Sequence, residues 1–150
     1  MLQTGGVNGR RPSASPWVLV VEDDDIVRAV ITAVLEEDGY RVLSAINGAA
    51  AMQLLEHPAV PEPACIILDL WMPVMDGREF IDAYRCAGQQ VPIIAVTGAW
   101  FPTSTMPAPD VDELLAKPFD IEELLGLVRK YAGGKRAGGR IRSVRALVPV

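Results

Sequence analysis

The sequence predicts an α/β fold, a doubly wound sheet of five parallel strands with helices on both faces. Three observations lead to this prediction. Short continuous apolar runs, typical of buried parallel strands, alternate with segments whose apolar residues recur at helical spacing. Acidic, hydroxyl or basic residues directly follow several of these runs, where a parallel sheet places its binding residues. The chain has 150 residues, half of them hydrophobic, and so can form one substantial core.

The first four strands alternate regularly with three helices. We expect strands at residues 17–21, 40–45, 64–68 and 92–96. Helices are expected after the acidic segment 22–25 as far as Gly39, from Gly48 to Pro58, and through Phe80, Ile81 and Tyr84 to Gly88. Strands that alternate with helices in this way predict a parallel sheet.

The pattern changes after the fourth strand. Pro102, Pro107 and Pro109 each lack a backbone donor and disfavour helix at the preceding residue. We therefore expect the fourth helix, between the fourth and fifth strands, to be short or absent. A fifth strand at 113–116 and a last helix capped by Asp120 complete the predicted fold.

The two ends of the chain differ in composition from the part between them. Residues 1–16 are rich in Gly, Ser, Pro and Arg, and residues 132–150 are basic and rich in glycine. We expect a disordered N-terminal segment and a solvated tail around one domain at 17–131. This domain holds all 19 acids but only seven basic residues, a net charge of −12. Such a charge repels phosphates, so we expect no nucleic-acid binding by the domain.

The cysteines and the hydropathy pattern indicate in which cellular compartment the protein is expected. Cys65 and Cys86 lie in apolar patterns without metal-type spacing, so we expect reduced core thiols, as in cytosolic proteins. No apolar run has the length of a signal peptide or a membrane span. We expect a cytoplasmic protein with no membrane contact.

Three acids are predicted to meet at one edge of the sheet. Asp69 follows the third apolar run, and the turn Met72–Gly77 then leads the chain away from the sheet. Taken alone, Asp69 is explained well as an acid that forms this turn. Right-handed crossovers, however, bring Glu22 and Asp23 to the same edge. Neighbouring carboxylates repel one another unless a cation compensates, and oxygen ligands suit Mg²⁺ first and Mn²⁺ second.

Two further residues extend this predicted site. Thr97 follows the fourth strand and Lys117 follows the fifth, which adds a hydroxyl donor and a positive charge. Donors and cations around a metal suit a transferred phosphoryl group, whose charge is spread over three oxygens in the transition state. Asp69 would then be the nucleophile and form an aspartyl phosphate.

With these motifs in place, the chain resembles the receiver domain of two-component response regulators, which has a flavodoxin-like fold. The resemblance extends from Val18 to Tyr131. It rests on four motifs, which are Val-Val-Glu-Asp-Asp at 20–24, Leu-Asp-Leu-Trp-Met-Pro-Val-Met-Asp-Gly at 68–77, Val-Thr-Gly at 96–98 and Lys-Pro-Phe at 117–119. It implies a phosphoryl donor that is a sensor histidine kinase, a histidine phosphotransfer protein or a small acyl phosphate.

The resemblance also implies a role for each site residue. Asp69 would be the phosphoacceptor, and Thr97 and Lys117 would hold the phosphoryl oxygens, with a cis peptide bond between Lys117 and Pro118. The implied metal ligands are the side chains of Asp23 and Asp69, Glu22 through water, and the backbone carbonyl of Trp71.

Two departures from the family pattern lead to further predictions. Leu114 stands where receivers usually carry an aromatic switch residue, so the usual aromatic movement is not expected. The segment Ala95-Val-Thr-Gly-Ala-Trp100 is similar to a motif of stand-alone receivers with a degenerate fourth helix, and we expect Trp100 or Phe101 to pack over the sheet there.

The positions that commonly orient the hydrolytic water in this family hold Trp71 and Ala99, neither of which has a polar side chain to orient water. We therefore expect slow intrinsic dephosphorylation.

The function that follows is a single-domain response regulator that signals by phosphorylation-dependent protein contacts. It would be no enzyme beyond its own phosphorylation and dephosphorylation. The alternative is a receiver-like module that binds proteins independently of phosphorylation. Two enzyme classes fit less well: dehalogenase-type phosphatases need a second acid where Trp71 stands, and the sequence contains no phosphate loop of an NTPase.

Overall fold

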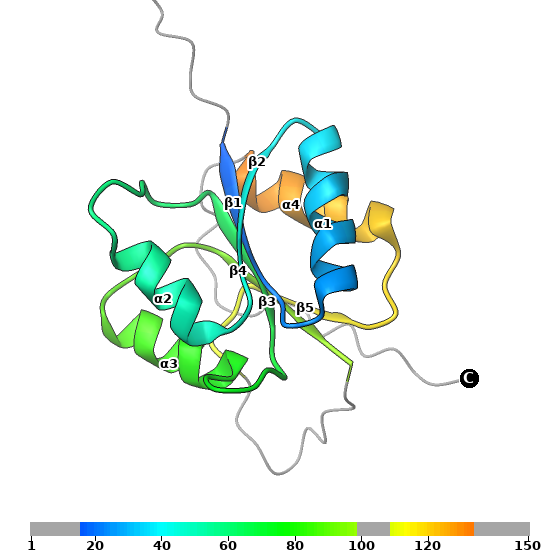
Figure 1. The fold of residues 1–150 in the computed structure, drawn as a ribbon. Coiled ribbons are helices and arrows are strands. Elements are labelled where there is room, and N and C mark those ends of the chain that lie inside the picture. The colour runs from blue at the N-terminus through cyan, green and yellow to red at the C-terminus, as the bar shows by residue number, and fades with distance from the viewer. Residues whose placement is uncertain (1–15, 99–108, 134–150) are drawn as a thin grey trace, which may run out of the picture.

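The computed structural model describes residues 16–98 and 109–133, which form a parallel sheet between two layers of helices (Figure 1). The strands are β1 (Trp17–Val21), β2 (Arg41–Ala45), β3 (Cys65–Asp69), β4 (Ile93–Thr97) and β5 (Glu113–Ala116). The helices of this described part are α1 (Asp25–Glu37), α2 (Gly48–Glu56), α3 (Gly77–Cys86) and α4 (Ile121–Ala132). The strand order is β2-β1-β3-β4-β5, all parallel, which is the flavodoxin-like order. The predicted fold class is therefore confirmed.

The core lies on both faces of the sheet because successive residues of a strand point to opposite sides. In β1, Leu19 belongs to the apolar cluster under α2 and α3, whereas Val18 and Val20 belong to the cluster under α1 and α4. Figure 1 shows these two pairs of helices on opposite sides of the sheet. Strands β1, β3 and β4 are buried along their whole length, which is why their sequences are continuous apolar runs.

Each helix begins where a short polar side chain satisfies its free backbone N–H groups. The caps are Asp24, Asn47, Asp76 and Asp120, and each side chain accepts a hydrogen bond from a backbone N–H two or three residues later. Gly39 and Gly88 follow α1 and α3 with positive φ values of 96° and 81°, which favour glycine. These local signals explain why the predicted boundaries agree with the structure within a few residues.

One sequence expectation was wrong. Cys65 is buried in β3, as expected, but Cys86 is exposed at the end of α3 and is not a core thiol. The helical spacing of α3 turns Phe80 and Tyr84 toward the sheet and Cys86 toward solvent.

Some expectations lie partly or wholly outside the described residues. Between β4 and β5, Gly98 and residues 109–112 contain no helix, and residues 99–108 are outside the description, including Ala99, Trp100 and Phe101. The same holds for residues 1–15 and 134–150 of the two predicted tails. Within 16–98 and 109–133, no helix is both long and apolar enough to cross a membrane.

Candidate functional site

The sheet delivers five predicted site residues to its carboxyl edge. Asp69 ends β3 and is paired in register with Val96 of the neighbouring strand β4. Thr97 is the next residue of β4 and so lies at the same edge of the sheet. The backbone N–H of Lys117 donates to the Thr97 carbonyl at 2.8 Å, which brings the residue after β5 to the same edge. Glu22 and Asp23 follow β1 directly.

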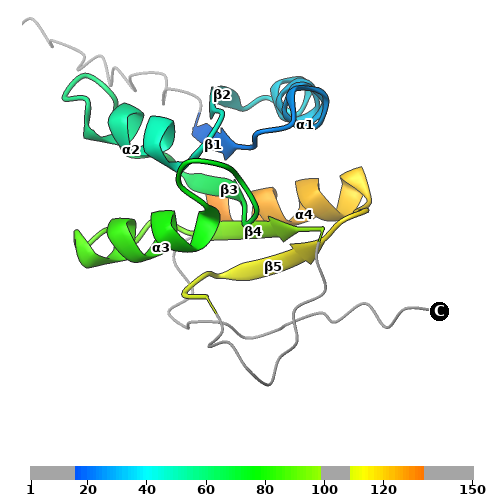
Figure 2. The same cartoon turned by 60° about the horizontal axis from the view of Figure 1, so that its bottom comes forward.

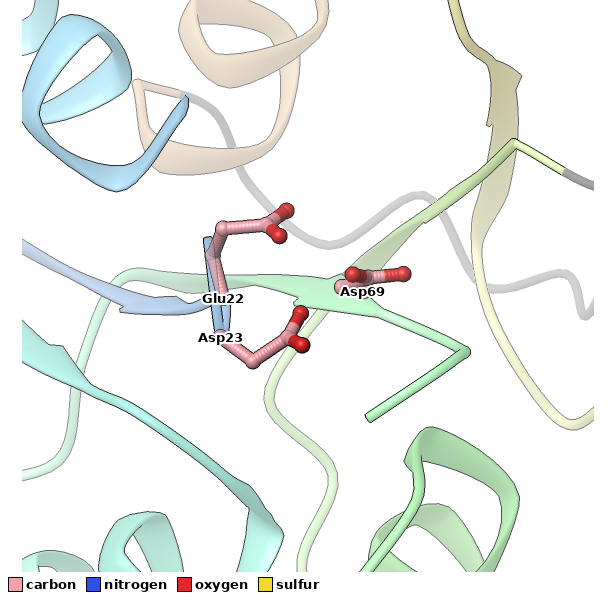
Figure 3. A group of neighbouring side chains, drawn as sticks. All are labelled: Glu22, Asp23 and Asp69. Atoms are coloured by element: carbon pink, nitrogen blue, oxygen red, sulfur yellow. The ribbon is translucent and has the colours of Figure 1, made fainter. Parts of the chain in front are cut away.

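Three carboxylates converge at this edge. One oxygen each from Glu22, Asp23 and Asp69 lies within 4.8 Å of the others, and Figure 3 shows the three side chains directed into the same space. Glu22 and Asp69 are 2% and 5% exposed, whereas Asp23 is open to solvent. Hard oxygen ligands at this spacing, with one side open, fit a divalent cation that keeps part of its water shell. The residues present therefore fit the magnesium site implied by the sequence.

Lys117 supplies a positive charge to this cluster. Its Nζ lies 3.0 Å from Oε2 of Glu22 and 3.5 Å from Oδ2 of Asp69. Burial acts to lower the pKa of Lys117, but the hydrogen bond to Glu22 and the charge of Asp69 outweigh it, so the pKa is raised above its ordinary value. The ammonium group thus stays charged at neutral pH and bridges two carboxylates.

Glu22 is the carboxyl group most strongly affected by this environment. Burial raises its pKa to about 7; the ion pair with Lys117 opposes this rise, and the neighbouring Asp69 adds to it. Its Oε1 also accepts a hydrogen bond from the backbone N–H of Asp24 at 3.2 Å. Burial is therefore the main reason why the charged form of Glu22 is disfavoured, and the charge of Asp69 adds to it.

Asp69 is both a turn-forming acid and a member of the cluster. Its Oδ1 accepts a hydrogen bond from the backbone N–H of Trp71 at 3.0 Å, while Oδ2 faces Lys117. The turn hydrogen bond fixes the carboxylate plane and leaves the second oxygen on the side of the ammonium group. Trp71 itself is 56% exposed. The peptide bond between Lys117 and Pro118 is cis, as the resemblance implied.

Close backbone packing supports the loop after β3. A Cβ atom on Gly77 would lie 2.6 Å from the carbonyl oxygen of Asp69, and one on Gly48 would lie 2.9 Å from that of Met75. The N–H of Gly48 donates to the same Met75 carbonyl at 3.1 Å. Val74 has a φ of 72°, a conformation that costs a β-branched residue about 1–3 kcal/mol and needs support from its surroundings. Sequence reasoning did not assign these supporting roles, although both glycines follow an Asn or Asp that caps a helix.

The comparisons with known proteins agree with this geometry. Residues 18–129 match the family described as the response regulator receiver domain. The chain belongs to this family. Receiver domains work in two-component signalling, and the sequence resemblance is confirmed.

Similar curated proteins include longer response regulators. The receiver is 35% identical over 114 residues to the response regulator MprA of Mycolicibacterium vanbaalenii, which covers 75% of this chain and 48% of that protein. It is 32% identical over 123 residues to a probable transcriptional regulatory protein of Picosynechococcus, which covers 78% of this chain and 49% of that protein. The chain thus spans about half the length of these relatives.

Similar solved structures are themselves receiver domains. The receiver domain of the sensor histidine kinase PA1611 from Pseudomonas aeruginosa is 30% identical, with a TM-score of 0.71 over 81% of this chain and 100% of that one, and holds a magnesium ion in its active site cleft. The chemotaxis response regulator CheY4 of Vibrio cholerae is 30% identical, with a TM-score of 0.69 over 79% of this chain and 99% of that one.

Proposed function

We propose that this receiver accepts a phosphoryl group on Asp69, with Mg²⁺ bound by Asp23 and Asp69, by Glu22 through water and by the Trp71 carbonyl. The observation that supports this most is the convergence of three carboxylates and Lys117, from three separate strands, at one edge of the sheet. The magnesium ion described for the similar PA1611 receiver supports the choice of metal. The donor would be a sensor histidine kinase or a histidine phosphotransfer protein.

In the proposed reaction, Oδ2 of Asp69 attacks phosphorus. A new O–P bond forms while the bond from phosphorus to the donor breaks, and the donor leaves with the bonding electron pair. Lys117 lies 3.5 Å from Oδ2 and would neutralise a phosphoryl oxygen, and the Thr97 hydroxyl would donate a hydrogen bond to another. Bound magnesium would supply further charge neutralisation to the transferred group.

Phosphorylation would act by changing the protein contacts of the domain. The receiver would use the same site whether it works alone or as part of a longer regulator such as its relatives. A phosphorylation-independent binding module would need no ammonium group held between two buried acids, so the site geometry favours the phosphoacceptor role.

The direct test is to incubate the protein with acetyl phosphate and measure its intact mass. With Mg²⁺ we expect the mass of one added phosphoryl group, and with EDTA in place of Mg²⁺ we expect little or none, because the acids would then repel the phosphoryl oxygens. Equal phosphorylation with and without the metal would contradict the proposal.

Asp23→Asn tests the metal site separately from phosphorylation. We expect Mg²⁺ affinity to fall by more than about tenfold, because even the loss of an outer partner of a ligand costs ~10–100-fold. Without metal, the variant should melt at the same or a higher temperature, since one of three repelling carboxylates is gone. Both effects can be measured by Mg²⁺ titration of tryptophan fluorescence and by thermal melting.

Asp25→Asn is the matched control for this variant. It removes an exposed acid two residues away, at the start of α1 and outside the cluster, so Mg²⁺ affinity should stay near that of the unmodified protein. An equal loss of Mg²⁺ affinity in both variants would indicate that binding depends only on the net negative charge of the loop and not on Asp23 as a ligand.

A further inference from the structure

Helix α1 carries apolar residues on two of its faces. The inward face belongs to the apolar cluster that α1 shares with α4 and the sheet. The outward face, which we call the α1 outer stripe, also has helical spacing and consists of Ile26, Ala29, Val30 and Ala33. All four residues are exposed, Ile26 to 76% and Val30 to 47%. An exposed apolar stripe of this kind is typical of a surface that another segment of chain covers.

Negative charge lies at the end of the α1 outer stripe. Figure 2 shows α1 nearly end-on at the outside of the fold, with β1 and β2 to one side of it. Glu37 continues the spacing of the stripe, and Glu36 lies beside it; both are exposed. Neither acid takes part in any of the ion pairs within residues 16–98 and 109–133. The stripe therefore suits an apolar segment that also carries positive charge.

Residues 134–150, which follow α4, have this composition. They contain no acid and five basic residues, which are Lys135, Arg136, Arg140, Arg142 and Arg145. Their apolar residues Ile141, Val144 and Val148 stand at positions i, i+3 and i+7, a spacing that places them on one face of a helix. Ile26, Ala29 and Ala33 of the α1 outer stripe have the same spacing, so the two apolar faces match in length.

The place where this segment begins also fits. Arg129 in α4 donates two hydrogen bonds to the carboxylate of Asp38, which directly follows α1, at 2.7 and 3.0 Å. Gly133 follows Arg129 by about one helical turn, so residues 134–150 start near the end of α1. The eight residues from Gly133 to Ile141 span up to about 26 Å, whereas the whole of α1 spans about 20 Å. The segment after Ile141 can therefore reach any part of the stripe.

We propose that residues 140–148 pack on the α1 outer stripe of their own chain, as a short helix antiparallel to α1. The apolar face of the segment covers the stripe, and the two alanines of the stripe allow the helices to approach closely. Lys135 and Arg136 pass the acids at the end of α1. A helix of this length is marginal alone and exposed ion pairs are weak, but the short connection to α4 gives the segment a high effective concentration.

Paramagnetic broadening in NMR spectra of the full chain tests this contact. A nitroxide is attached at Ser143→Cys in a Cys86→Ser background; Cys65 is buried, with a pKa raised to about 12, and does not react. We expect the amide signals of Ala29 and Ala33 to broaden. The signals of α3, which lies on the opposite face of the sheet, should stay sharp. The measurement uses neither Mg²⁺ nor a phosphoryl donor, so its result is independent of the proposed function.

Val30→Lys tests whether the stripe itself is the binding surface. The new charge lies within the stripe, so the broadening of the α1 signals should be lost, while the exposed position leaves the fold intact. Leu43→Lys is the matched control, because Leu43 is similarly exposed, at 41%, but lies on β2 outside the stripe. This variant should keep the full broadening.

A charge exchange tests the proposed direction of the segment. Glu36→Lys combined with Glu37→Lys should weaken the broadening, and adding Lys135→Glu with Arg136→Glu should restore it. The proposal is overturned by broadening that is absent, spread over both faces of the domain, or unchanged in Val30→Lys. It is also overturned by broadening seen only between a labelled and an isotope-enriched copy, which would place a second copy on the stripe.

Discussion

Asp69→Asn is expected to abolish the phosphoryl adduct formed with acetyl phosphate and Mg²⁺. The amide nitrogen that replaces one carboxylate oxygen is no nucleophile at neutral pH, and the charge that attracts both metal and Lys117 is lost. The amide oxygen can still accept the hydrogen bond of the Trp71 N–H, so the turn is retained. Intact-mass measurement should show only the unmodified protein, with a melting temperature at least as high as before because carboxylate repulsion is reduced.

Asp76→Asn is the control for this experiment. Asp76 lies in the same loop and caps α3 through a hydrogen bond from the Glu79 N–H, a role that asparagine fills equally well. This variant should gain the phosphoryl group at the normal rate. If Asp69→Asn were phosphorylated to the same extent, another residue would be the acceptor and the proposed function would fail in its central point.

Gly77→Ala is expected to destabilise the domain by about 3 kcal/mol, a large part of the ~5–15 kcal/mol that stabilises a typical domain. The new Cβ would lie 2.6 Å from both the Asp69 carbonyl oxygen and the Leu70 Cα. These are backbone atoms, one of them on the proposed phosphoacceptor, so the loop must move to accept the methyl group. Urea unfolding followed by circular dichroism measures the loss.

Gly126→Ala is the matched substitution in another helix. Gly126 lies within α4, and a Cβ there would meet nothing within 4 Å. Alanine is the better helix former, so this variant should gain about 0.5–1 kcal/mol. If Gly77→Ala were as stable as the unmodified protein, the loop after β3 would be free to shift and would not position Asp69 rigidly.

Much of the fold followed from local patterns. Buried parallel strands require continuous apolar runs, and short polar caps such as Asn47 and Asp120 mark helix starts, so both features were readable in the sequence. The convergence of Glu22, Asp23, Asp69 and Lys117 was predictable because crossover handedness places the ends of parallel strands at one edge.

Other features depend on contacts between distant segments and left no local pattern. Arg85 on α3 donates hydrogen bonds to the carbonyls of Val91 and Asp110 and to the Asp112 side chain, which ties the entry of β5 to α3. A single arginine in a helix gives no indication of such partners. The exposure of Cys86, by contrast, follows from local helical spacing, because Cys86 lies off the face of α3 that carries Phe80 and Tyr84.

The ion pair between Glu22 and Lys117 joins residues 95 positions apart. Ribosomes make the chain from its amino end, so all three acids are synthesised well before the lysine that compensates two of them. A nascent domain without β5 would hold its carboxylates together against their mutual repulsion, with the closing strand still missing. The cluster of acids therefore gains its compensating positive charge only when the last strand has been made and has docked on the sheet.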